Sequence, residues 1–130
     1  MNIPLFQKIM RHFSIEYDVI HDLDSKYAKN GNANPAWTIN ERIWDEIELA
    51  SDNGVPAAGF VFNTNFESQH GVPEGTWRGK PLEAITQIAN WDLDPDTSDK
   101  AVVRILASIL DCTKSKLFFN WKEVEKLGDA

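Results

Sequence analysis

The sequence predicts a single α/β domain in which helices alternate with short strands. Several segments repeat apolar residues at helical spacing, whereas residues 16–21 and 57–62 are short runs rich in β-branched and aromatic residues. Each run ends abruptly in polar residues. The chain has 130 residues, of which 42% are hydrophobic and 25% charged, which suits one globular domain with its own core.

The first half of the chain predicts helix, strand and helix in that order. Apolar residues at helical spacing predict a helix over residues 3–13, and the strand at 16–21 follows at once. Residues 25–38 are polar and rich in turn residues, which predicts a loop. Thr38 and Glu41 match a capping box, so we expect a helix over 39–51, stopped by Asp52-Asn53-Gly54.

The second half begins with the strand at 57–62 and a loop over 68–79 that is rich in Gly and Pro. Lys80-Pro81 then opens a helix, because proline suits a first helical turn. An acidic loop over 92–98 leads to a helix over 101–110, with Thr97 or Ser98 as its cap. Residues 117–122 are apolar without a period and fit either a strand or a helix.

Composition excludes several classes of protein. The single cysteine, Cys112, cannot form an internal disulfide and fits a buried free thiol, as in a cytoplasmic protein. No apolar run reaches the roughly 18 residues of a membrane span. The formal net charge of −7 opposes non-specific binding to nucleic acid, unless cations or a basic surface on another domain or chain compensate.

Two aspartates close the first predicted strand. Asp22 and Asp24 stand where ligands and metals bind in open α/β sheets, and their carboxylates suit Mg²⁺ or Mn²⁺. The alternative is that they are ordinary turn residues, which commonly follow strands. Asp92-Leu93-Asp94 repeats the tripeptide without a strand before it, so the tripeptide alone is weak evidence for a metal site.

Glu67 follows the second predicted strand, and Lys80 stands at a junction of loop and helix. If the two strands are parallel neighbours, their carboxyl ends share one edge of the sheet, where three carboxylates and a lysine converge. Such a set holds one or two divalent cations, with Lys80 stabilising charge on a phosphoryl group. The alternatives are a solvated loop carboxylate at Glu67 and a surface lysine at Lys80.

Four stretches in this order resemble the Toprim domain of OLD-family ATP-dependent endonucleases. They are Asn2-Ile3-Pro4-Leu5-Phe6, the run from Tyr17 to Ser25, Asn65-Phe66-Glu67 and Gly79-Lys80-Pro81-Leu82-Glu83-Ala84. The resemblance implies a Rossmann-like Toprim sheet, small and mostly parallel with flanking helices, and two-metal hydrolysis of DNA. It implies Asp22, Asp24 and Glu67 as Mg²⁺ or Mn²⁺ ligands, with Glu67 and Lys80 as catalytic residues. Residues 1–95 then form a partial Toprim core, and 96–130 a helical extension of the same domain.

The chain departs from the family pattern at its start. The glutamate-bearing strand unit that usually opens a Toprim domain has no counterpart in residues 1–15, and the sequence shown contains no segment that we expect to form the family's ATPase domain. We therefore expect an N-terminally truncated fold that acts on DNA with help from another domain or chain, or forms a homodimer. The alternative is a catalytically inactive, acidic Toprim-like domain that binds other proteins.

Overall fold

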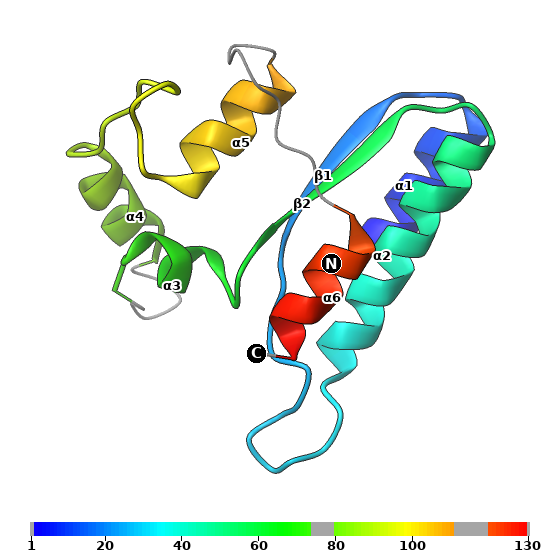
Figure 1. Ribbon diagram of the computed structural model, residues 1–130, viewed down its shortest axis with the longest axis horizontal. Coiled ribbons are helices and arrows are strands. Elements are labelled where there is room, and N and C mark those ends of the chain that lie inside the picture. The colour runs from blue at the N-terminus through cyan, green and yellow to red at the C-terminus, as the bar shows by residue number, and fades with distance from the viewer. Residues whose placement is uncertain (1, 74–79, 111–119, 130) are drawn as a thin grey trace. The chain divides into compact units, whose positions relative to one another are not determined.

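The computed structural model describes residues 2–73, 80–110 and 120–129. These residues form an α/β protein of six helices and a parallel two-stranded sheet (Figure 1). The α/β prediction is therefore confirmed, and the Rossmann-like Toprim arrangement and the division at residue 95 stay predictions. None of the helices in the described ranges is long and apolar enough to cross a membrane.

The chain divides into two compact units. Unit 1 comprises Met1–Val61 and Phe118–Ala130, and unit 2 comprises Phe62–Leu117.

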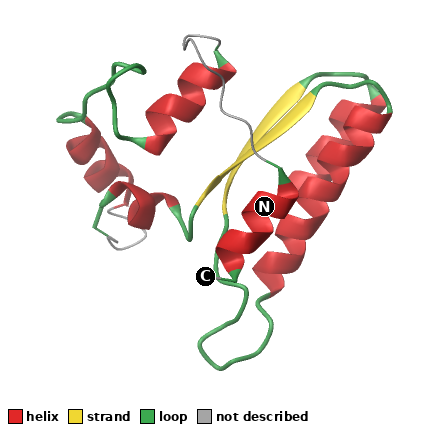
Figure 2. Cartoon of the chain, in the orientation of Figure 1, coloured by secondary structure: helices red, strands yellow, loops and turns green. Residues whose placement is uncertain are grey.

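Unit 1 is built as helix, strand, helix, strand and a closing helix. The helix between the two strands makes the crossover that parallel neighbours require, and Figure 2 shows the strands side by side in yellow. The last residue of the second strand, Phe62, already belongs to unit 2. The elements are α1 (Ile3–His12), β1 (Tyr17–Asp22), α2 (Pro35–Asp52), β2 (Ala57–Phe62) and α6 (Trp121–Gly128).

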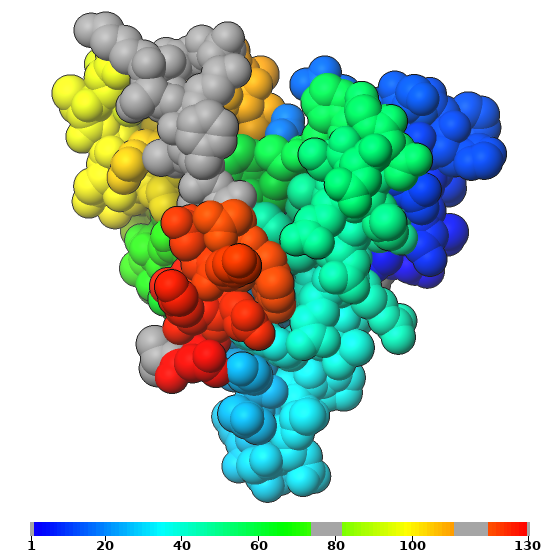
Figure 3. Space-filling view, turned by 45° about the vertical axis from the view of Figure 1, so that its right-hand side comes forward, coloured from blue at the N-terminus to red at the C-terminus, as the bar shows by residue number. Residues whose placement is uncertain are grey.

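The core of unit 1 lies between β1 and one face of α2. Alternate residues of β1 are buried, and α2 contributes apolar side chains at helical spacing. Helix α6 covers this core, since Val124 is 1% exposed and the Trp121 ring lies 5.8 Å from that of Trp37. Figure 3 shows α6 against α2, with the end of α6 beside the loop where Lys26 bonds Asp129 at 2.6 Å.

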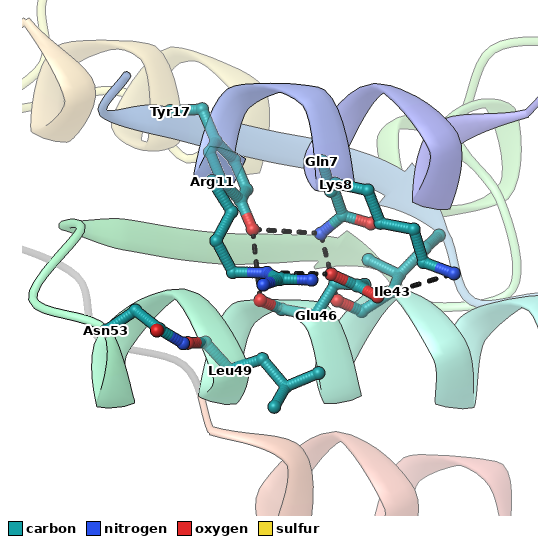
Figure 4. Close-up of polar contacts among 8 residues, drawn as sticks. All are labelled: Gln7, Lys8, Arg11, Tyr17, Ile43, Glu46, Leu49 and Asn53. Atoms are coloured by element: carbon teal, nitrogen blue, oxygen red, sulfur yellow. Dashed lines mark hydrogen bonds and ion pairs between the residues drawn. The ribbon is translucent and has the colours of Figure 1, made fainter. Parts of the chain in front are cut away.

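A buried carboxylate joins α1 to α2. Glu46 of α2 is 6% exposed, and its oxygens lie 3.3 Å from Arg11 Nε and 3.8 Å from Lys8 Nζ (Figure 4). The Tyr17 hydroxyl donates to the Glu46 carbonyl at 3.3 Å. A buried carboxylate without such partners would be strongly destabilising, so this pairing fixes how α1 lies on α2.

The start of α2 differs from the prediction. The helix begins at Pro35 rather than near residue 39, and the Asn34 side chain accepts a hydrogen bond from Ala36 N at 3.1 Å. The predicted cap at Thr38 is therefore wrong. The earlier start places Trp37, which is 5% exposed, inside the helix and in the core.

Unit 2 holds helices α3 (Phe66–His70), α4 (Lys80–Ile88) and α5 (Ala101–Ile109). The sequence predicts α4 and α5 correctly but assigns residues 68–79 to a loop, and α3 extends into that range. Asn65 caps α3 by accepting from Ser68 N at 2.8 Å, and Gly71 ends it with φ +66°.

The cap of α5 comes from another helix. The predicted caps Thr97 and Ser98 are wrong, because α5 begins at Ala101 and its N-cap position, Lys100, makes no side-chain cap. Instead, His70 of α3 accepts a hydrogen bond from Val102 N at 3.0 Å. His70 is 5% exposed and stacks on Trp91 with ring centroids 5.4 Å apart. One imidazole thus joins α3, α5 and the aromatic core of unit 2.

The segment at residues 117–122, for which the sequence fits either a strand or a helix, is helical at residues 121–122. Helix α6 begins at Trp121 with Asn120 as its cap, whereas residues 117–119 of the undecided 117–122 run lie outside the described residues. Cys112 lies outside them too.

We predict that Gly59→Ala destabilises unit 1 by about 1–3 kcal/mol through overpacking. A Cβ at Gly59 would lie 2.8 Å from Ile47 Cδ1 and 2.8 Å from the Trp44 ring, which are both buried. Urea unfolding of the full chain measures the loss. In the Ile47→Val background, which lacks Cδ1, the added cost of Gly59→Ala should be smaller, and full additivity of the two changes would contradict this packing.

Candidate functional site

The two aspartates of interest lie where β1 ends. Asp22 is the last residue of β1, Asp24 follows two residues later, and both are exposed. Leu23 between them is 1% exposed and belongs to the core of unit 1. The backbone is therefore anchored by a buried side chain between two exposed carboxylates.

Hydrogen bonds to its carbonyl oxygens hold this segment in place. Asn40 of α2 donates to the Leu23 carbonyl from a buried position, and the Asn34 side chain donates to the Ser25 carbonyl at 2.8 Å. Asn34 also caps α2, so the loop after β1 is tied to the start of the following helix. Because the backbone of this segment is already fixed, little conformational entropy is lost when a ligand binds here.

A third contact comes from His21, the residue before the pair. Its Nδ1 lies 2.9 Å from the Asp22 carbonyl oxygen, and the indole Nε1–H of Trp44 donates to its Nε2 at 3.0 Å. Because an indole N–H only donates and a carbonyl only accepts, His21 carries its proton on Nδ1 and is neutral.

Burial lowers the pKa of the His21 imidazole below its ordinary value. The hydrogen bond to the Asp22 carbonyl and the charges of Asp22 and Asp24 act in the opposite direction and offset only part of this shift. Because the His21 imidazole is neutral, it places no positive charge beside Asp22 and Asp24.

Asp24 has a left-handed backbone, with φ +60°. Aspartate and asparagine tolerate this conformation better than other residues with a Cβ, and such residues cluster at functional sites. The left-handed turn at Asp24 ends the extended course of β1 immediately after the buried Leu23.

The other two predicted site residues belong to unit 2. Glu67 lies in the first turn of α3, and Lys80 is the first residue of α4. The predicted convergence of Glu67 and Lys80 with Asp22 and Asp24 remains a prediction.

Three residues that support the pair are absent from the sequence-based prediction: Asn34, Asn40 and Trp44. A signal for Asn40 exists, because it shares a helical face with Ile43, Trp44 and Ile47 and is 3% exposed. A polar residue on an apolar face is expected to have a specific partner. Asn34-Pro35 also matches the start of a helix.

The chemistry of the Asp22 and Asp24 side chains suits a magnesium-type ion in a partly hydrated state. Among the described residues, no group of three or more His, Cys, Asp or Glu side chains is placed to hold a metal ion. Mg²⁺, however, usually keeps several waters and binds through one or two carboxylates together with substrate phosphates. Asp22 and Asp24 supply such a pair of exposed, hard oxygen ligands.

In comparisons with known proteins, no family model, curated protein or solved structure matches this chain. The site and the sequence resemblance are therefore the grounds for a functional proposal.

We predict that acid destabilises unit 1 through His21. Its pKa is lowered in the folded state, so the unfolded chain binds the proton more tightly. The contribution to stability is complete above the ordinary value of 6.5 and is lost as the pH falls from there through the lower folded pKa. Urea unfolding at pH 7.5, 6.5 and 5.5 measures it. His21→Gln, which keeps an acceptor for Trp44, should flatten this pH dependence, and an unchanged slope would contradict the assignment.

We predict that the backbone at Asp24 discriminates between substitutions. Asp24→Asn should change the free energy of unfolding by less than about 0.5 kcal/mol, since asparagine adopts the same conformation. Asp24→Val should cost about 1–2 kcal/mol, because a β-branched residue is strained at positive φ. Thermal or urea unfolding of both variants checks this, and equal stabilities would show that the left-handed turn is not required.

Proposed function

We propose that this chain is a divalent-cation-dependent phosphodiesterase domain of the Toprim type, acting on DNA. The observation that carries the proposal is the Asp22–Asp24 pair, which presents two exposed carboxylates from a fixed backbone at the carboxyl end of a parallel strand. The sequence resemblance described above supports the choice of reaction and substrate.

The residues of unit 1 have defined roles in this proposal. Asp22 and Asp24 hold Mg²⁺ or Mn²⁺, which when bound supplies Lewis-acid activation of water and of a phosphoryl oxygen. Asn34 and Asn40 position the two carboxylates by holding the carbonyls of Ser25 and Leu23. His21 stays neutral and so does not reduce the negative charge that attracts the cation.

Two further roles come from the resemblance. Glu67 provides an additional carboxylate as ligand and catalytic residue, and Lys80 provides a positive charge that stabilises the transferring phosphoryl group. With a formal net charge of −7, the chain depends on the cation and on a basic surface of another domain or chain to hold DNA.

We predict that the double variant Asp22→Asn, Asp24→Asn loses Mn²⁺ binding. Calorimetric titration of the full chain should give a binding isotherm for the wild type and none for this variant, because amides are weaker ligands for hard cations than carboxylates. The matched control is Asp92→Asn, Asp94→Asn, which removes two charges at the same spacing from the repeated tripeptide. In that loop, the aspartates accept hydrogen bonds from Asp94 N and Asp96 N, each at 2.9 Å. The control should bind Mn²⁺ as the wild type does, and equal behaviour of all three proteins would refute the metal site.

Nicking of supercoiled plasmid in Mn²⁺ tests the reaction itself. Cleavage that disappears in both the Asp22→Asn, Asp24→Asn variant and Lys80→Ala supports the nuclease proposal. The contrary result is that the wild type binds Mn²⁺ but does not cleave DNA when the metal site is saturated. Asp22 and Asp24 would then remain a metal site, and the proposal that this chain alone is a nuclease would be overturned.

A further inference from the structure

The loop between β1 and α2, residues 23–34, adjoins the candidate site and carries an exposed aromatic side chain. Tyr27 follows Asp24 by three residues and is 62% exposed. Three residues of chain span at most about 11 Å, so the Cα atoms of Asp24 and Tyr27 lie within that distance of each other. Figure 1 shows this loop, in light blue, extending beyond the end of β1.

Hydrogen bonds hold the backbone of this loop in a hairpin-like turn. Tyr27 and Ala33 form an antiparallel bridge, and inside it Ala28 N donates to the Asn32 carbonyl at 2.8 Å. Gly31 makes the turn with φ +80°, and its N–H donates to the Ala28 carbonyl at 2.8 Å. Because the backbone that carries the Tyr27 ring is already fixed, little conformational entropy is lost when the ring binds a ligand.

The loop lacks acidic side chains in a chain that is otherwise rich in them. Residues 25–40 contain no Asp or Glu, although the whole chain has 20 acidic residues against 13 Lys and Arg. Lys26 is paired with Asp129 of α6 at 2.6 Å, and the charge of Glu125 on the same helix also acts on it. Lys29 is exposed and makes no ion pair with any residue that the structure describes. Lys29 is therefore the cation that this loop offers to an anionic ligand.

An exposed aromatic ring and a cation beside the candidate site are the groups that recognise a single nucleic-acid strand. Proteins that bind single strands combine positive charge along the backbone with aromatic side chains on which bases stack. In a duplex, neighbouring base pairs already cover the faces of each base, so the ring finds a base only where the strands are open. At about 3.4 Å per nucleotide, the loop lies within roughly three nucleotides of a phosphate held at Asp24.

We propose that the β1–α2 loop selects single-stranded DNA for the aspartate site, with Tyr27 stacking on an unpaired base and Lys29 pairing with a phosphate. This inference rests on the proposed function, since the phosphate to be cleaved is the one held by the cation at Asp22 and Asp24. Negative supercoiling favours local opening of a duplex, so a supercoiled plasmid remains a substrate and its relaxed form is a poorer one.

Titration of the full chain in Ca²⁺, which also takes carboxylate and phosphate oxygens, tests the inference. Fluorescence anisotropy gives the affinity for a short oligonucleotide as a single strand and as a duplex, and the wild type should bind the single strand about tenfold more tightly. A version with 2-aminopurine at alternate positions reports stacking, because an aromatic ring on this base analogue quenches its fluorescence. Tyr27→Ala should lose about tenfold in single-strand affinity and most of the quenching. Tyr27→Phe keeps the ring and should stay within about twofold of the wild type.

Two further variants separate the ring and the cation from general effects. Phe13→Ala is the matched control, because Phe13 is 70% exposed and precedes the start of β1, at the opposite end of the strand. It should bind and quench as the wild type does. Lys29→Gln should lower the slope of log affinity against log salt concentration by about 0.7, which is the value of one phosphate contact on a single strand. Urea unfolding of Tyr27→Ala should match that of the wild type, since the ring is exposed.

Cleavage of the same oligonucleotide in Mn²⁺ distinguishes the failure of this inference from the failure of the nuclease proposal. If the wild type cleaves DNA but Tyr27→Ala binds and quenches equally, or the duplex binds as tightly as the single strand, the inference is overturned and the nuclease proposal stands. If quenching depends on Tyr27 but the wild type cleaves nothing, single-strand recognition is supported and the nuclease proposal is overturned. An unchanged salt slope in Lys29→Gln would remove the phosphate contact, and no binding by the wild type would refute the loop as a DNA site.

Discussion

Three hydrogen bonds between α2 and the β1 segment determine how unit 1 is assembled. The Tyr17 hydroxyl donates to the Glu46 carbonyl, Trp44 donates to His21, and Asn40 donates to the Leu23 carbonyl. All three lie in the buried interior of unit 1, where an unpaired polar group is costly. A shift of α2 by one helical turn would break all of them at once, so these bonds select one alignment from the several that apolar packing alone permits.

The same alignment creates the electrostatic character of the candidate site. The indole donor keeps His21 in one neutral tautomer, so burial and hydrogen bonding act together at this residue. The two aspartates that follow are exposed, and the neighbouring imidazole brings no positive charge to them. The packing of β1 against α2 and the charge at the site are therefore linked. Trp44 packs α2 on β1 and also keeps the imidazole next to Asp22 neutral.

Local patterns in the sequence were sufficient for most elements but insufficient for their ends. Apolar residues at helical spacing predicted α1, the body of α2 and α5, and short runs of β-branched and aromatic residues predicted both strands. Thr38 and Glu41 matched a capping box, yet burial of Trp37 extended α2 to Asn34. The cap of α5 comes from His70, which no local window includes. At the site, the position of Asp22 and Asp24 after a strand was predictable. The sequence carries signals for Asn34 and Asn40, but not the identity of their partners. The Ser25 carbonyl, the Leu23 carbonyl and, for Trp44, the His21 ring meet these side chains only in the folded chain.

The closing helix of unit 1 has a consequence for the order in which the protein forms during synthesis. Val124 and Trp121 complete a core begun by Trp37 and Trp44, and Gly128 lies so close to the Trp37 ring that a Cβ there would overlap it. All of Phe62–Leu117 is translated between these two segments. A nascent chain therefore carries two uncovered tryptophans on α2 until the ribosome has released residues 121–128. Throughout that interval unit 1 is incomplete and its core is open to chaperones or to aggregation.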